Sequence, residues 1–153
     1  MDSRYTGIID ECAAAMAAVM PTNVVRVEKL ASNAVEIGCS SKLWPVLFPQ
    51  AGPGMKHLRK IQLAPWQERA VARFPWQLLR GLIHSDGSRV INRVNGGEYP
   101  RYFFSQVSTD IQRIFCDACD FIGVEWRRNR WNSISIARRR SVELMDSFVG
   151  PKS

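Results

Sequence analysis

Apolar residues recur every three to four positions in several stretches of the chain, and this period predicts helices. The clearest stretch runs from Leu78 to Gly87, where Leu79, Leu82, Ile83 and Asp86 fall on one helical face. Pro75 suits a first helical turn and Gly87 suits a helix end. The same period predicts helices over residues 7–20, 65–73, 110–121 and 141–149, and a helix beginning within residues 41–47.

Between these helices, apolar and polar residues alternate as they do in strands. In the second half of the chain the alternation predicts strands over residues 88–94, 99–107, 124–128 and 132–137. Asn95-Gly96-Gly97 is a hairpin signal between the first two, and Asn129-Arg130 suits a tight turn between the last two. From residue 74 the predicted order is helix, strand, strand, helix, strand, strand, helix. This order predicts an α+β fold with an antiparallel sheet.

The first half of the chain repeats the later part of that order, with a helix over residues 7–20 and strands over residues 24–27 and 34–39. Its apolar positions align with those of the second half: Ile8, Ala13, Met16 and Val19 with Ile111, Cys116, Cys119 and Ile122, and Val35 and Ile37 with Ile134 and Ile136. We infer a degenerate internal duplication, with chance similarity as the alternative. The expected organisation is a partial first repeat at 1–50, a linker and short helix at 51–73, and a full αββαββα repeat at 74–153.

The composition is that of a globular protein, with 46% hydrophobic and 23% charged residues. No apolar run reaches the roughly 18–20 residues of a membrane span. Asp10 and Glu11 precede the apolar stretch 13–20, which argues against a signal peptide. Cys116 and Cys119 lie within a helical pattern, while Cys12 and Cys39 are isolated, so reduced cysteines and a cytoplasmic location are expected.

A net charge of +7 favours an anionic partner, most commonly nucleic acid. The arginines are clustered: Arg127, Arg128 and Arg130 lie among Trp126 and Trp131, and Arg138, Arg139 and Arg140 follow the last predicted strand. A solvated turn and helix start is the alternative for these clusters. We favour phosphate contact because both clusters border predicted strands.

Two features of the helix before Gly87 point to chemistry. Gly81 lowers helix stability by about 1 kcal/mol relative to alanine, which makes sense where another backbone approaches closely. Asp86 lies at the negative end of the helix dipole, where a carboxylate is disfavoured by a few tenths of a kcal/mol. A divalent metal ion is the positive partner expected to offset this effect.

Residues 80–87, Arg-Gly-Leu-Ile-His-Ser-Asp-Gly, resemble the signature of the LAGLIDADG homing endonucleases at the glycine, leucine, isoleucine, final aspartate and last glycine. His84 departs from the family pattern, which has an aspartate there. The resemblance implies a LAGLIDADG-like αββαββα fold whose curved antiparallel sheet lies in the DNA major groove. It covers residues 74–149 well in element order and the first half more loosely.

The resemblance also implies roles for individual residues. Side chains on the strands would contact double-stranded DNA, and which of them face it depends on strand register. The candidates are Arg89, Asn92, Arg93, Arg101, Arg127, Arg128, Arg130 and Arg138. In this family the motif helix packs against a second copy of itself, here through Leu79, Gly81 and Leu82. The chain carries one such helix, so we expect either a homodimer or a first motif helix that is missing from this sequence.

Catalysis in this family is phosphodiester hydrolysis assisted by a divalent metal ion, here Mg²⁺ bound by Asp86. Gln106, in Ser105-Gln106-Val107-Ser108, resembles a glutamine that orients water near the metal. Arg140, or its neighbours Arg138 and Arg139, stands in for a family lysine, although arginine is a poor proton shuttle.

The first hypothesis is therefore a DNA endonuclease, associated with the nucleoid when bound to DNA. The second is a catalytically inactive DNA-binding or transcription-regulatory protein on the same scaffold. The third is a scaffold that binds RNA or protein.

Overall fold

The computed structural model describes residues 1–55 and 58–153, which form two compact units. Unit 1 comprises residues 1–49 and 152–153, and unit 2 comprises residues 50–151. The segment 51–73, expected as a linker and short helix, belongs to unit 2 apart from Lys56 and His57, which lie outside the described residues. None of the helices in the described part of the chain has the length and apolar character that a membrane span requires.

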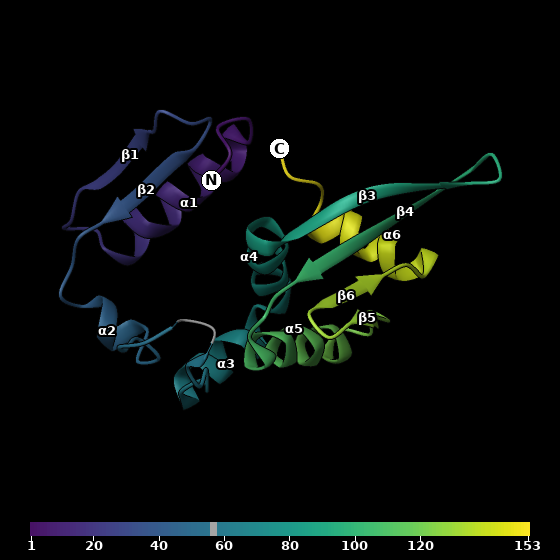
Figure 1. Cartoon of the computed structure of the whole chain (residues 1–153). Helices are drawn as coiled ribbons and strands as arrows, with labels where there is room; N and C mark the ends of the chain where they lie inside the picture. Colours follow the sequence, from purple (N-terminus) through teal and green to yellow (C-terminus); the bar gives the residue numbers. More distant parts are fainter. Residues whose placement is uncertain (56–57) are drawn as a thin grey trace. The chain divides into compact units, whose positions relative to one another are not determined.

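Unit 1 is a helix followed by a two-stranded antiparallel hairpin and a short helix (Figure 1). Its elements are α1 (Thr6–Val19), β1 (Val25–Lys29), β2 (Val35–Cys39) and α2 (Trp44–Leu47). The buried apolar side chains of this unit are Ile8, Ile9, Met20 and Val35. Helix α2 covers only the second half of the segment predicted to start a helix, and it begins beside a proline that is tolerated in a first turn.

Unit 2 has the predicted order of helices and strands and is of the α+β class (Figure 1). After α3 (Pro65–Arg73) its elements are α4 (Pro75–Asp86), β3 (Gly87–Val94), β4 (Gly97–Ser105), α5 (Thr109–Phe121), β5 (Arg127–Arg130), β6 (Ser133–Ile136) and α6 (Arg139–Phe148). The four strands form one antiparallel sheet in the order β3-β4-β6-β5.

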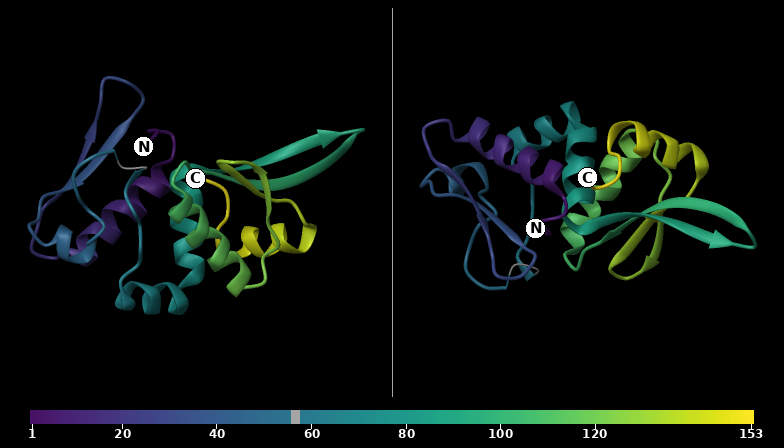
Figure 2. Two further views of the ribbon diagram at one scale, coloured as in Figure 1. Left: turned by 60° about the horizontal axis from the view of Figure 1, so that its bottom comes forward. Right: turned by 90° about the horizontal axis from the view of Figure 1, so that it is seen from above.

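Helices α4, α5 and α6 pack on one side of this sheet and leave the other side open, as the views of Figure 2 show. The buried core joins Leu79 and Ile83 of α4 to Tyr102 and Phe104 of β4. It also contains residues of the later elements, namely Phe115, Cys116, Ala118, Cys119, Val124, Ile134, Ile136, Val142, Met145 and Val149. The same alternation that buries Tyr102 and Phe104 therefore directs their neighbours on β4 to the open side.

The predicted hairpin between β3 and β4 is confirmed. Val94 pairs with Gly97, and Asn95 and Gly96 between them have φ values of 51° and 77°. A two-residue turn with positive φ at both positions matches the twist of the flanking strands.

The turn predicted at Asn129-Arg130 is wrong by two residues, because β5 continues to Arg130 and the turn follows at Trp131-Asn132. The cause is Val124, expected to begin the strand. Val124 is buried in the core, and its N–H donates to the carbonyl of Cys119 at the end of α5. Residues 124–126 therefore form the connection that follows α5, and pairing with β6 starts only at Arg127.

The four cysteines are free thiols. Burial raises the pKa of Cys116 to about 11 and that of Cys119 further, so these two are inert core residues.

Candidate nucleic-acid interface and carboxylate site

The strand register divides the predicted DNA-contacting residues between the two sides of the sheet. Residues directly opposite each other in an antiparallel pair project to the same side. Val90 lies opposite Arg101 and Asn92 opposite Tyr99, and both pairs are on the side away from buried Tyr102. Arg127 pairs with Ser135, and Arg130 pairs with Ser133, on the same open side.

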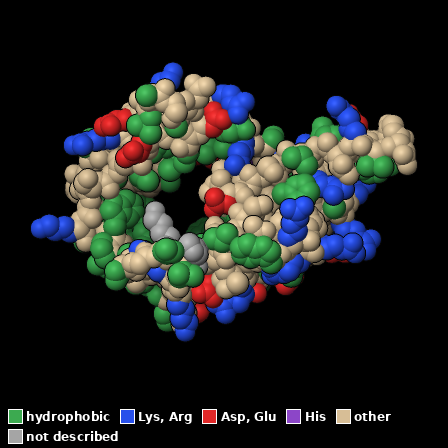
Figure 3. Space-filling model, in the orientation of Figure 1, with side chains coloured by type: hydrophobic (Ala, Val, Ile, Leu, Met, Phe, Trp, Pro, Cys, Tyr) green, Lys and Arg blue, Asp and Glu red, His purple; other side chains and the backbone are tan. Residues whose placement is uncertain are grey.

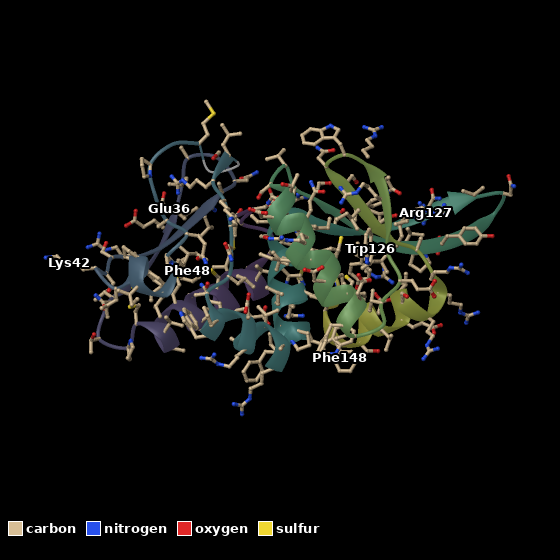
Figure 4. The ribbon with its side chains drawn as sticks, turned by 90° about the horizontal axis from the view of Figure 1, so that it is seen from below. Glu36, Lys42, Phe48, Trp126, Arg127 and Phe148 are labelled. Carbon is tan, nitrogen blue, oxygen red and sulfur yellow. The ribbon has the colours of Figure 1, made fainter. Side chains whose placement is uncertain are left out.

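Among the predicted contacts, Asn92, Arg101, Arg127 and Arg130 thus lie on the open face, which we define by the outward residues of the four strands. These residues are Ser88, Val90, Asn92, Tyr99, Arg101, Phe103, Ser105, Arg127, Asn129, Arg130, Ser133 and Ser135. The set contains no Asp or Glu. Figure 3 shows Lys and Arg side chains gathered over β4, β5 and β6, and Figure 4 labels Arg127 at the start of β5 beside Trp126.

Local contacts hold several side chains of the open face in place. The guanidinium of Arg101 lies 5.9 Å from the ring centroid of Phe103, and its Nε is buried with no hydrogen-bond partner among the described residues. Asn129 sits at an irregularity in the β5–β6 pairing, where its Oδ1 accepts a hydrogen bond from Ser135 Oγ at 3.1 Å. Phe103, Ser105, Asn129, Arg130, Asn132 and Ser133 line a hollow of about 460 Å³ on this face.

The remaining predicted contacts lie off the open face and interact with other residues of the protein. Arg89 lies opposite Tyr102 on the helix-covered side, where its Nε donates to Asp146 Oδ1 of α6 at 2.6 Å. Arg128 lies opposite Ile134 and donates to the side-chain oxygen of Gln112 on α5. Arg93, opposite Glu98, is on the same side as Arg89.

Arg138 lies outside the sheet, directly before α6, and pairs with Glu125 at 3.4 Å. Register places Arg89, Arg93 and Arg128 on the other side of the sheet, and Arg138 lies outside it, so the structure does not bring these four together with the arginines of the open face.

Asp86 and Gln106, predicted to act together, are brought into contact. Helix α4 passes into β3 without a loop, which leaves the exposed carboxylate of Asp86 at the junction of the two elements. Gln106 follows β4 directly and donates from Nε2 to Asp86 Oδ2 at 3.2 Å. Its Oε1 accepts the backbone N–H groups of Val107 and Ser108 at 2.9 and 3.2 Å, so three hydrogen bonds fix the amide.

Gln112 positions Gln106 and was not identified from the sequence. Its Nε2 donates to the Gln106 carbonyl at 2.6 Å, and its oxygen accepts from Arg128. The side chain is buried although it is polar. A polar residue at an inward helical position was the available signal, because such a group must find partners inside the fold.

Arg140 does not join this pair. Strand β6 starts beside Ser105, next to Gln106, and ends at Ile136 opposite Tyr102, so the chain enters α6 at the far end of the strand. Within the described ranges, no hydrogen bond or ion pair links Arg140 to Asp86 or Gln106, and neighbouring Arg139 pairs with Glu143 on α6.

The carboxylate that this candidate site offers to a divalent metal ion is that of Asp86. In residues 1–55 and 58–153 no three His, Cys, Asp or Glu side chains are grouped so as to hold a metal ion. Mg²⁺ is commonly held by one or two carboxylates together with water and substrate phosphates, rather than by a cage of protein ligands. One exposed carboxylate with a fixed neighbouring amide fits the form of that mode in which the protein supplies a single carboxylate.

The three residues expected to pack against a second motif helix differ in how exposed they are. Leu79 is fully buried in the core of unit 2 and cannot form an interface, because its helical position faces the sheet. Gly81 is exposed, and a Cβ built there meets no atom within 4 Å, so no described backbone approaches it. Leu82 is only partly buried.

No protein-family model matches the chain, and no curated protein matches it either.

Proposed function

We propose that this protein is a LAGLIDADG-type DNA endonuclease, with an αββαββα unit that binds duplex DNA on its open face and contributes Asp86 to phosphodiester cleavage. The observation that carries the proposal is the segregation of arginines. Arg101, Arg127 and Arg130 meet no acidic residue on the open face, whereas Arg89 on the other side is neutralised by Asp146.

The shape of the open face supports major-groove binding. The groove of B-DNA is about 12 Å wide and admits a two-stranded β-ribbon. The β3–β4 hairpin extends past the helices (Figure 1). Tyr99, on the open side of β4, is exposed. Arginine pairs well with guanine, and asparagine with adenine, so Arg101, Arg127, Arg130 and Asn92 are the proposed base or phosphate contacts.

Asp86 is the proposed metal ligand at the edge of this face. A divalent ion bound there would stabilise the leaving oxygen and lower the pKa of a bound water. Gln106 holds its amide beside the carboxylate and would orient that water through the hydrogen-bond donor it now directs at Asp86. Asp86 would hold the ion where the strands end, and the positive charge of the ion would attract the phosphodiester.

Cleavage of both DNA strands on this proposal needs a second motif helix, from a homodimer or from a further segment. The exposed Gly81 and half-buried Leu82 leave a face of α4 on which such a helix would pack. Action on DNA would place the protein in the cytoplasm with the nucleoid.

A second candidate function is DNA binding without cleavage. It is favoured by the single carboxylate of the site and by the separation of Arg140 from Asp86. This protein would share the open face and the salt-dependent binding of the endonuclease but would leave DNA intact.

The test uses two variants that separate binding from cleavage. Asp86→Asn should abolish Mg²⁺-dependent nicking of supercoiled plasmid while duplex binding changes little. Arg127→Gln should weaken duplex binding by about tenfold, since one good base contact contributes roughly 1–3 kcal/mol, or should reduce the salt slope by about one if the contact is to phosphate. Arg113→Gln, at an exposed arginine of α5 that pairs with Asp110, is the matched control and should change neither.

The outcomes distinguish the candidates. Equal nicking by Asp86→Asn would overturn the site. Salt-dependent binding by a wild-type protein that never nicks would support the non-catalytic candidate. A duplex affinity that does not fall with salt would overturn the proposed phosphate contacts, because such contacts release counterions, and would favour the scaffold that binds RNA or protein.

A further inference from the structure

The hollow on the open face of the sheet has a structural cause. Ser105 of β4 lies opposite Ser133 of β6, and these two small side chains leave space beside them. The β5–β6 pairing shifts between Arg128 and Arg130, so Asn129 is an extra residue there. Such a bulge bends the strand and redirects a side chain. The resulting volume of about 460 Å³ lies within the roughly 300–1,000 Å³ of small-molecule pockets.

The lining of the hollow combines one aromatic ring with mostly neutral polar groups. The ring is that of Phe103, which projects from the open face and is half-buried. The polar groups are two hydroxyls, two amides and one guanidinium, supplied by Ser105, Ser133, Asn129, Asn132 and Arg130. Among the described residues, no carboxylate lines the hollow.

These groups match the chemistry of a nucleobase. A nucleobase is flat and uncharged, with two aromatic faces and an edge of hydrogen-bond donors and acceptors. Aromatic side chains stack on such faces, and amides and hydroxyls, which both donate and accept, pair with such edges. Two contacts hold the lining in place before any ligand binds: the Arg101 guanidinium lies 5.9 Å from the Phe103 ring centroid, and Ser135 Oγ donates to Asn129 Oδ1 at 3.1 Å. Groups that are already fixed lose less conformational entropy on binding.

A base reaches the face of the Phe103 ring only when it has left the helical stack. Paired bases in B-DNA cover one another's faces and present only their edges in the grooves. A nucleotide without a pairing partner leaves the stack at the lowest cost in free energy, which favours its selection by a pocket. The hollow therefore fits an unpaired base better than a paired one.

The hollow also adjoins the candidate carboxylate site. Ser105 of the lining directly precedes Gln106, and the Gln106 N–H donates to the carbonyl of Asn132 at 3.0 Å. Gln106 in turn donates to Asp86 Oδ2 at 3.2 Å. A nucleotide whose base occupied the hollow would therefore be held at the edge of the sheet where Asp86 lies.

We propose that this hollow binds one unpaired nucleobase of otherwise double-stranded DNA. The base stacks on Phe103, and its edge forms hydrogen bonds with the amides of Asn129 and Asn132. The inference rests on the proposed DNA binding by the open face, and it names the substrate class as a duplex that contains an unpaired nucleotide.

The test compares three DNAs of one sequence in the absence of metal ions, so that cleavage does not contribute. They are a fully paired duplex, the same duplex with one extra unpaired nucleotide in one strand, and a single strand. Fluorescence anisotropy gives the Kd of each. We expect the duplex with the unpaired nucleotide to bind about tenfold more tightly than the paired duplex, which is within the range that stacking of one base on an aromatic side chain contributes.

A photocrosslink locates the base in the complex. When the unpaired base is 5-iodouracil, irradiation should join the DNA to Phe103, because this base reacts with an aromatic ring on which it stacks. Mass spectrometry of the digested protein identifies the joined residue. A crosslink to a residue outside the hollow would overturn the proposal without the need for any variant.

Variants at the ring complete the test. Phe103→Ala should remove the preference for the unpaired nucleotide, whereas Phe103→Tyr keeps an aromatic ring and should retain it. Phe121→Ala removes an exposed phenyl ring of α5, on the helix-covered side of the sheet, and is the matched control that should change no Kd.

The outcomes separate this inference from the proposed function. Equal affinity for the two duplexes would overturn the inference and leave duplex binding in place. A single strand bound as tightly as the duplex with the unpaired nucleotide, together with no binding of the paired duplex, would overturn the duplex context of both proposals. Binding of none of the three DNAs would overturn both.

Discussion

At the scale of single residues, Arg89 of β3 and Arg101 of β4 lie close together in the sheet but face opposite sides of it. Arg101 projects from the open face, whereas Arg89, whose neighbour Val90 pairs with Arg101, projects into the helices. There Asp146 accepts two hydrogen bonds from Arg89, at 2.6 and 2.8 Å, and one from the Tyr102 hydroxyl at 2.6 Å. The interaction fixes α6 to β3 and β4, and it removes Arg89 from the charge available to a ligand.

The Arg89–Asp146 pair predicts a pH-dependent loss of stability. Hydrogen bonds from Arg89 hold the pKa of Asp146 below its ordinary value, so the pair stabilises the fold above about pH 4 and this contribution is lost as pH falls through the lower native pKa. Asp146→Asn should lower the free energy of unfolding at pH 7 by about 1–2 kcal/mol, after allowance for partial exposure. The difference from wild type should shrink in acid.

Chemical denaturation at pH 7 and pH 3 measures this effect. Glu98→Gln is the matched control, because its pair with Arg93 is exposed on both sides and should contribute less than about 0.5 kcal/mol. A pH-independent difference between Asp146→Asn and wild type would contradict the assignment.

At the scale of elements, the direct passage from α4 into β3 determines where Asp86 lies. Gly87 has φ −110° and needs no special backbone conformation. It is required for space, since a Cβ there would come within 2.8 Å of the Ile83 Cα and of the Phe103 carbonyl oxygen. The close approach holds the end of the helix against β4, and so it holds Asp86 next to Gln106.

Two glycine substitutions in the same segment should have opposite effects. Gly87→Ala should destabilise unit 2 by about 1–3 kcal/mol, the usual effect of overpacking against backbone. Gly81→Ala should stabilise an isolated chain by up to about 1 kcal/mol, because the position is open and alanine favours the helix. Thermal unfolding of both variants, with solution mass alongside, measures this difference. Gly87→Ala as stable as wild type would refute the packing argument, and a Gly81→Ala variant that lowers the solution mass would place a second chain on that face.

At the scale of the whole molecule, the two units differ in how much apolar surface they bury. Unit 2 has a continuous core drawn from α4, β4, α5, β6 and α6. Unit 1 buries Ile8, Ile9, Met20 and Val35 and leaves Val24, Val46 and other apolar side chains exposed. Small cores give little stability, so cooperative unfolding of the two units together is not expected.

Hydrogen exchange should therefore show two levels of protection. Amides of α1, β1 and β2 should exchange at least 100-fold faster than those of α5, β4 and β6, since local opening requires less free energy where less apolar surface is buried. Mass spectrometry of peptides from the two units makes the comparison in one experiment, with unit 2 as the internal control. Equal protection in both units would mean that they fold as one.

The sequence by itself determined the elements, because their signals are local. Helical period, strand alternation and the Asn95-Gly96-Gly97 turn predicted the αββαββα order of residues 74–149, and the resemblance to the LAGLIDADG signature associated Asp86 with Gln106. What only the tertiary structure decided is which side of the sheet each side chain faces. Side chains alternate between the two sides of a strand, so a shift of one residue in the pairing moves every side chain to the other side of the sheet. The register is fixed by pairing with strands that are distant in the sequence. Because of that pairing, Arg89 bonds to Asp146 and Arg128 bonds to Gln112. Arg101, Arg127 and Arg130 project from the open face instead. Among the described residues, the outer edge of β2 is unpaired at Ile37.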